Sequence, residues 1–106
     1  MTADLLFEVT TPIAVVVRCS RSYWNFIVTY KHPIMAGLEQ DVETVLADPD
    51  EVRRSRQDPD LLLFYRASSR PWLCAVARCE DGTGFLITVY PTDAIKAGEI
   101  IWTKSR

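Results

Sequence analysis

The chain contains a single histidine, His32, which lies at the end of a predicted helix and directly before Pro33. Histidine ordinarily titrates near neutral pH, so His32 is the first candidate for moving a proton during a reaction. The alternative is a structural histidine that lies near the last carbonyl groups of the helix and takes no part in chemistry. The residue type by itself leaves both interpretations open.

Polar side chains recur in the strands that we predict for the second half of the chain. The candidates for one shared patch are Tyr65 or Arg66, Arg78, Thr88 and Tyr90, with Arg54 or Ser55 added from an edge strand. Arginine binds phosphate, tyrosine stacks on bases and threonine orients them, so such a patch is suited to binding RNA. The other interpretation is an ordinary solvated sheet face, because threonine and tyrosine are also good strand formers.

The sequence carries no P-loop, dinucleotide-binding, zinc-protease or nucleophile-elbow motif. Its three cysteines, Cys19, Cys74 and Cys79, are odd in number and form no C-x-x-C pair. On one strand, Cys74 and Cys79 would point to opposite faces, which disfavours a shared zinc ion. We therefore expect three reduced cysteines, no metal and no cofactor, so that any catalysis would use side chains alone.

Length and composition indicate one globular domain over residues 1–106. The net charge is −2, but the stretch from Glu39 to Asp60 holds eight acidic residues against three arginines. This balance argues against indiscriminate binding of nucleic acid, although it leaves room for a local basic surface. No apolar run approaches the roughly 20 residues of a membrane span, and acidic residues stand where the basic part of a signal peptide would be. We expect a cytoplasmic protein with no membrane partner.

Hydrophobic periodicity predicts the elements that must position these side chains. Helices are expected over 22–31, with Ser20 or Ser22 as the N-cap, and over 36–47. Strands are expected over 5–9, 13–19, 52–56, 61–66, 72–79, 85–90 and 99–104. Glu80–Gly84 reads as a hairpin connection with two glycines for positive φ, Ala67–Pro71 as a turn, and Pro91 as the end of a strand.

These elements predict an α+β domain. Two N-terminal helices should pack on one face of a twisted antiparallel sheet built from 52–56, 61–66, 72–79 and 85–90. In this arrangement the polar residues of the late strands would lie on the sheet, and His32 would lie where the first helix ends.

The order of short motifs along the chain carries a resemblance to a known group. The motifs are Lys31-His32-Pro33, Met35, Glu39, Val42, Leu46, Pro49, Val52, Ser55, Asp58 and Tyr65, followed by Ile87–Thr92, Ile95-Lys96, Gly98-Glu99 and Trp102. This layout resembles small domains grouped with the barnase–EndoU–colicin–RelE-like nucleases. That group includes phage-borne versions and the toxins of toxin–antitoxin pairs.

The resemblance implies a metal-independent endoribonuclease in which the RNA 2′-OH attacks the adjacent phosphate. Such chemistry needs a base, an acid and cations for the transition state. By position, the catalytic residues would be His32, Arg54, Tyr65 and Thr88, and the substrate-binding residues would be Lys31, Ser55, Arg66 and Tyr90. His32 would be the base or the acid, and Arg54 or Arg66 the phosphate clamp. RNA and a protein partner such as an antitoxin are the expected partners. The alternative is a non-catalytic member of the fold that binds protein or nucleic acid.

Overall fold

The computed structural model describes residues 4–66, 72–95 and 98–104, and within them one seven-stranded sheet with helical segments between the second and third strands. The strands are β1 (Leu5–Thr10), β2 (Val16–Ser20), β3 (Glu51–Arg54), β4 (Leu61–Arg66), β5 (Trp72–Glu80), β6 (Thr83–Thr92) and β7 (Glu99–Thr103). The helical segments are α1 (Arg21–Phe26), the π-helix η1 (Ile27–Lys31), the 3₁₀-helix η2 (Pro33–Met35) and α2 (Glu39–Ala47). The α+β class is therefore confirmed, but both helices lie mid-chain rather than at the N-terminus.

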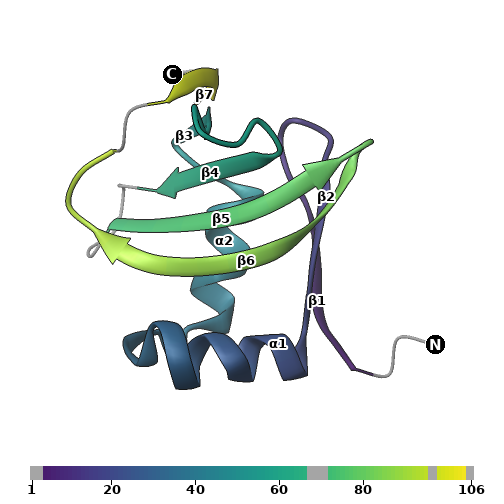
Figure 1. Cartoon of the computed structure of the whole chain (residues 1–106), viewed down its shortest axis with the longest axis vertical. Helices are drawn as coiled ribbons and strands as arrows, with labels where there is room; N and C mark the ends of the chain where they lie inside the picture. The colour runs from purple at the N-terminus through teal and green to yellow at the C-terminus, as the bar shows by residue number, and fades with distance from the viewer. Residues whose placement is uncertain (1–3, 67–71, 96–97, 105–106) are drawn as a thin grey trace.

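The sheet has the order β1-β2-β6-β5-β4-β3-β7. β3, β4, β5 and β6 pair antiparallel in sequence order, as the sequence predicts. The prediction of an entirely antiparallel sheet is wrong, because β2 runs parallel to β6 over Val16–Arg18 and Thr83–Phe85. Alternation along a strand indicates which face is buried but not the direction of its neighbour. Figure 1 shows the β1–β2 hairpin standing steeply beside the curved meander.

The first helical segment is capped and ended by its own sequence. Of the two predicted caps, Ser20 acts at the N-terminus of α1, where its hydroxyl accepts a hydrogen bond from the Tyr23 N–H at 3.0 Å. The helix then widens into η1, and the His32 N–H donates to the Ile27 carbonyl at 2.8 Å. Pro33 prevents further continuation, because the residue before a proline avoids the helical region. His32 therefore lies at the end of the helical segment, as expected.

The second helix begins three residues later than predicted. Gly37 has φ +84°, a left-handed conformation that no helix interior contains, and α2 starts only at Glu39. Val42, Val45 and Leu46 form the buried stripe of α2, in agreement with the predicted spacing. The 3₁₀ turn before Gly37 buries Met35 in the same core.

The helices pack against one face of the sheet, as the sequence predicts. The main core joins Trp24, Ile27, Val42, Val45 and Leu46 of the helical segments to buried side chains of all strands except β7. A second, smaller cluster lies on the opposite face and consists of Leu63, Tyr65, Cys74 and Val76, with no helical residue. We call this second surface the helix-free face. In Figure 1, α2 lies behind the sheet and α1 runs beneath β6.

The β5–β6 hairpin differs in detail from the prediction. The two turn residues are Asp81, with φ +55°, and Gly82, with φ +83°, as a two-residue primed turn requires. Gly84 belongs to β6 instead, and a Cβ there would lie 2.6 Å from the Arg78 carbonyl oxygen. Gly84 is thus needed for close approach of two strands rather than for a positive φ.

Pro91 does not end β6, which continues to Thr92. A proline is tolerated there because β2 pairs only with Thr83–Phe85, so the end of β6 has β5 as its one paired neighbour. The chain beyond Thr92 is irregular as far as Ile95, and Lys96 and the predicted turn at Ala67–Pro71 lie outside the described residues. Within the described ranges, no helix has the length and apolar character needed to cross a membrane.

None of the three cysteines takes part in a disulfide in the structure. Cys74 belongs to the cluster on the helix-free face and Cys79 packs against the main core, so these two residues point to opposite faces as predicted. Burial raises the pKa of the Cys19 thiol to about 12 and that of Cys79 to about 11. Both thiols therefore stay protonated in the folded chain where an unfolded chain would begin to lose the proton.

Stability should fall above pH 9 because of Cys19. Between pH 9.0, its ordinary value, and about 12, the unfolded state loses a proton that the folded state keeps. This difference lowers the free energy of unfolding by about 1.4 kcal/mol per pH unit for one group. Urea titrations at several pH values should show a wild-type slope that is steeper by about this amount than the slope of Cys19→Ala, in which the contribution of Cys79 remains. Equal slopes in the two proteins would contradict a buried, protonated Cys19.

Candidate functional site

A cleft of about 520 Å³ lies on the helix-free face. Its floor consists of Leu61, Leu63 and Val76 from β4 and β5, and Thr88 and Tyr90 of β6 form one wall. The opposite wall is the short loop between β3 and β4, which contributes Ser55, Arg56 and Gln57. The cleft is therefore an apolar trough with hydroxyl groups on one side and amide, hydroxyl and guanidinium groups on the other.

Strand register explains why these residues meet. Thr88 of β6 is paired with Val76 of β5, and Val76 is paired in turn with Leu63 of β4. Two residues further along β6, Tyr90 is paired with Cys74, and Cys74 is paired in turn with Tyr65 of β4. Directly paired residues of adjacent strands present their side chains on the same face. Three of the predicted residues, Tyr65, Thr88 and Tyr90, thus share the helix-free face.

Thr88 and Tyr90 supply the polar atoms of the β6 wall. The Thr88 hydroxyl oxygen is shielded from solvent and has no hydrogen-bond partner among the described residues. Such an atom calls for an explanation, because buried polar groups are nearly always paired. The pKa of Tyr90 is raised well above its ordinary value, first by burial and then by the neighbouring Cys74 and Tyr65. Tyr90 therefore stays neutral at physiological pH.

His32 reaches the same wall from the end of η1. Its ring lies against that of Tyr90, with the two ring centroids 5.5 Å apart. The preceding residue, Lys31, donates from Nζ to the Ile87 carbonyl at 3.1 Å, and the Tyr23 hydroxyl donates to the same oxygen at 2.7 Å. These two bonds attach the helical segment to β6 next to Thr88, and so fix His32 at the end of the cleft wall.

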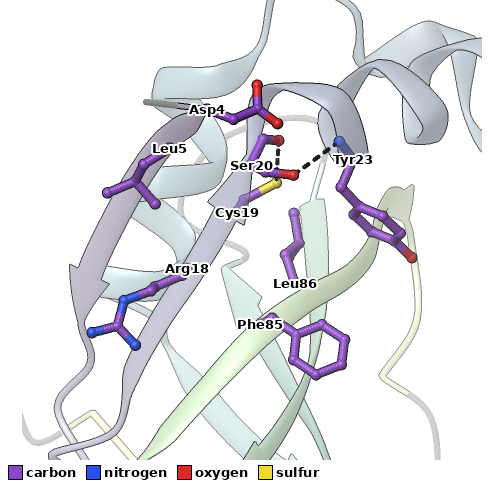
Figure 2. A pocket seen from close by; sticks show the side chains of 8 residues that line it. All are labelled: Asp4, Leu5, Arg18, Cys19, Ser20, Tyr23, Phe85 and Leu86. Carbon is purple, nitrogen blue, oxygen red and sulfur yellow. Dashed lines mark hydrogen bonds between the residues drawn. The ribbon is translucent and has the colours of Figure 1, made fainter. Parts of the chain in front are cut away.

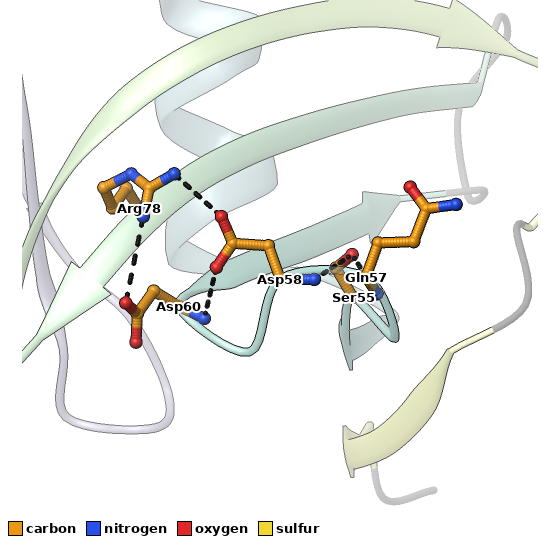
Figure 3. A network of polar contacts seen from close by, with 5 residues as sticks. All are labelled: Ser55, Gln57, Asp58, Asp60 and Arg78. Atoms are coloured by element: carbon orange, nitrogen blue, oxygen red, sulfur yellow. Dashed lines mark hydrogen bonds and ion pairs between the residues drawn. The ribbon is translucent and has the colours of Figure 1, made fainter.

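The loop that carries the opposite wall is held by a polar network (Figure 3). The Ser55 hydroxyl accepts hydrogen bonds from the N–H groups of Gln57 and Asp58 at 3.2 and 3.3 Å. The Asp58 carboxylate accepts from the Asp60 N–H at 3.1 Å and from Arg78 at 2.8 Å. These interactions lower the pKa of Asp58, the Asp60 N–H more than Arg78. The network fixes the loop on the helix-free face and leaves its tip over the cleft.

The side chain of Arg56 stands at that tip. It is exposed and lines the cleft, and no residue in the described parts of the chain forms an ion pair or hydrogen bond with it. A guanidinium without a carboxylate partner at the mouth of a cleft is suited to bind a phosphate group.

The two arginines predicted to hold phosphate lie elsewhere. Arg54 is paired with Leu62, whose side chain belongs to the main core, and Arg54 itself contacts Glu99 at 3.3 Å and the Pro59 carbonyl at 2.8 Å. Arg66 contacts the carbonyl and carboxylate of Asp48 at the end of α2, at 2.6 and 3.0 Å. Neither is brought to the helix-free face. The reason is that side chains alternate between the two faces of a strand, and both arginines occupy positions whose side chains point to the face of the main core.

The structure therefore brings some of the predicted site residues together at the cleft but not all of them. His32, Lys31, Ser55, Tyr65, Thr88 and Tyr90 lie in or beside the cleft, whereas Arg54 and Arg66 do not. Arg56 and Gln57 were missed because the strand was expected to continue to Arg56, whereas β3 ends at Arg54. The Asp58-Pro59-Asp60 turn was the available signal, since a turn so close favours a loop at Arg56.

Comparison of the chain with protein-family models, with curated proteins and with solved structures finds no match. Within the ranges that the structure describes, His, Cys, Asp and Glu side chains form no group of three or more suited to hold a metal ion.

Proposed function

We propose that the protein is a metal-independent endoribonuclease of the RelE/barnase-like type that acts on RNA bound in the cleft. One observation carries the proposal: the only histidine of the chain packs on Tyr90 at the wall of a cleft that also contains the Thr88 hydroxyl and the Arg56 guanidinium, neither of which has a partner among the residues that the structure describes. Transesterification of RNA needs groups that move protons and a cation for the charge of the transition state, and His32 and Arg56 are of these types.

The roles follow from the chemistry of each group. The 2′-OH attacks the adjacent phosphorus, its proton passes to a base, and the bond to the 5′-oxygen breaks as that oxygen takes up a proton. The products are a 2′,3′-cyclic phosphate and a new 5′-OH end. His32 serves as base or acid in these transfers. Arg56 neutralises the charge that develops on the phosphate oxygens, and the Thr88 hydroxyl donates a hydrogen bond to them, while Tyr90 holds the His32 ring at the cleft wall.

The remaining predicted residues have supporting roles in this proposal. Lys31 anchors the helical segment to β6 beside the cleft, Ser55 shapes the loop that carries Arg56, and Tyr65 packs beneath Tyr90. The proposal includes a cytoplasmic location, a place in a toxin–antitoxin or phage-associated system, and a protein partner such as an antitoxin. The cytoplasmic location comes from the sequence composition, and the other two come with the resemblance to RelE-like toxins.

One observation favours the non-catalytic alternative. Arg54 and Arg66 are engaged with carboxylate and carbonyl groups away from the cleft, so fewer cations face the phosphate than the sequence suggests. A domain that binds RNA or protein without cutting it needs fewer such groups.

Incubation with single-stranded RNA in EDTA separates the two functions. The nuclease should shorten RNA in EDTA, because its charges and proton carriers are side chains, and should leave DNA of the same sequence intact because DNA lacks the 2′-OH. The binding domain predicts no cleavage above a buffer control between about pH 5 and 9, a range that brackets the titration of an ordinary histidine. Gel analysis of end-labelled oligonucleotides gives the result directly.

A further inference from the structure

A second hollow opens where β2 and β6 separate beyond Arg18 and Phe85, the last residues that these strands pair. Its volume is about 420 Å³, and its walls are mostly apolar. They include Leu5 of β1, Tyr23 of α1, and Phe85 and Leu86 of β6, as Figure 2 shows. We call this hollow the wedge. It shares no lining residue with the cleft, so it is a separate site.

Phe85 lies at the mouth of the wedge and is 51% exposed. It is paired with Arg18 on β2 and with Arg78 on β5, so the three residues are neighbours on the helix-free face, where Arg78 also contacts Asp58 and Asp60. Aromatic rings flanked by arginines are the pattern with which proteins hold unpaired bases, because the ring stacks on the base and the cations contact the phosphates.

Arg18 has donors available for a phosphate. Its Nε donates to the Glu8 carboxylate, and the two terminal amino groups have no partner in the described residues. The carboxylate of Asp4, which also lines the wedge, accepts hydrogen bonds from the N–H and hydroxyl of Ser22. Asp4 is therefore directed to the start of α1.

We propose that the wedge binds one unpaired nucleobase of a single-stranded RNA, stacked on Phe85, with an adjacent phosphate on the terminal amino groups of Arg18. A base fits this site because its faces are apolar, like most of the lining, while its edges carry polar groups to which the Ser20 hydroxyl can donate a hydrogen bond. The inference rests on the proposed function, since it takes RNA as the ligand, and it adds a subsite for recognition of a neighbouring nucleotide.

The position of the wedge relative to the cleft supports a single strand of RNA over a free small molecule. Phe85 and Thr88 belong to the same strand, and both project on the helix-free face. They are separated by about 10 Å along β6, from a rise of about 3.3 Å per residue. An RNA strand with one phosphate at Thr88 therefore has a neighbouring nucleotide at Phe85.

Fluorescence anisotropy with a labelled, fully 2′-O-methylated RNA oligonucleotide tests the wedge without cleavage. Phe85→Ala should weaken binding by about 5- to 100-fold, the range expected when one base–aromatic stack is lost. Phe85→Leu should weaken it nearly as much, because leucine keeps an apolar side chain but not the ring. Ile100→Ala, at a side chain that is 54% exposed on β7, is the matched control and should bind within about 2-fold of the wild type.

The salt dependence of the same binding tests Arg18. Loss of one phosphate contact to single-stranded nucleic acid should reduce the slope of log Kd against log salt by about 0.7 in Arg18→Gln. Arg54→Gln, on the opposite face of the sheet, should keep the wild-type slope. Circular dichroism melting of each variant checks that the fold is retained.

The outcomes separate the wedge from the proposed function. If the wild type binds RNA and both Phe85 variants bind equally well, the wedge proposal fails while the nuclease proposal stands. If Phe85→Ala loses affinity but the wild type cuts no RNA, the wedge stands and the nuclease proposal fails. If the wild type binds no single-stranded RNA, both are overturned.

Discussion

Replacing His32 with alanine is expected to lower the rate of RNA cleavage by about 10²–10⁴-fold, the range that follows from loss of a general acid or base. The ring lies at the wall of the cleft, against Tyr90, and no other histidine can substitute for it. Initial rates on an end-labelled RNA at saturating concentration measure the effect on the chemical step.

Ile34→Ala is the control for this variant. Ile34 lies two residues away on the same segment and is 67% exposed, so its removal should change neither the rate nor the melting temperature. His32 is only partly buried, and His32→Ala should also melt close to the wild type. Full activity in folded His32→Ala would remove this residue from the mechanism.

Replacing Arg56 with alanine is expected to lower kcat/KM by about 10²–10³-fold, as the loss of one group that stabilises transition-state charge does. Arg56 lines the cleft and has no ion-pair partner in the described chain, so its guanidinium is available to the phosphate. The same kinetic assay, with substrate concentration varied, measures the change.

Arg54→Ala is the matched control, since it removes a guanidinium only two residues away. Arg54 lies toward the main core side and contacts Glu99 and Pro59, so its loss should change kcat/KM by no more than about 2-fold. An exposed ion pair of this kind contributes little to stability. Strong loss of activity in Arg54→Ala with a fully active Arg56→Ala would place the phosphate on the other side of the sheet.

The elements of this fold could be predicted from periodicity, but their exact spatial relations could not. The antiparallel pairing of β3 to β6 follows from short connections between alternating strands. The parallel contact of β2 with β6 joins segments more than 60 residues apart, and no local pattern specifies it. Only packing of the whole chain decides which strand lies beside the free edge of β6.

The positions of the candidate site residues could be predicted where the pairing of the strands is regular. They could not be predicted where the register between two strands shifts. Simple alternation in β6 would put Leu86, Thr88 and Tyr90 on one face. The register shift between β5 and β6 occurs next to Ile87, so Leu86 is buried in the main core while Thr88 and Tyr90 lie at the cleft. A one-residue irregularity of this kind has no sequence signature here, yet it decides which hydroxyl-bearing residues line the cleft.

The identity of the RNA products tests most directly whether the cleft carries out transesterification. After the cut site in a defined RNA has been mapped, cleavage is repeated in EDTA with an oligonucleotide that has a single 2′-deoxy nucleotide on the 5′ side of that site, and the products are weighed by mass spectrometry. We predict a 2′,3′-cyclic phosphate on the upstream fragment of the unmodified RNA and no cut at the substituted position. Cleavage at the 2′-deoxy position, or fragments that carry a 5′-phosphate, would contradict a mechanism that uses the 2′-OH as nucleophile.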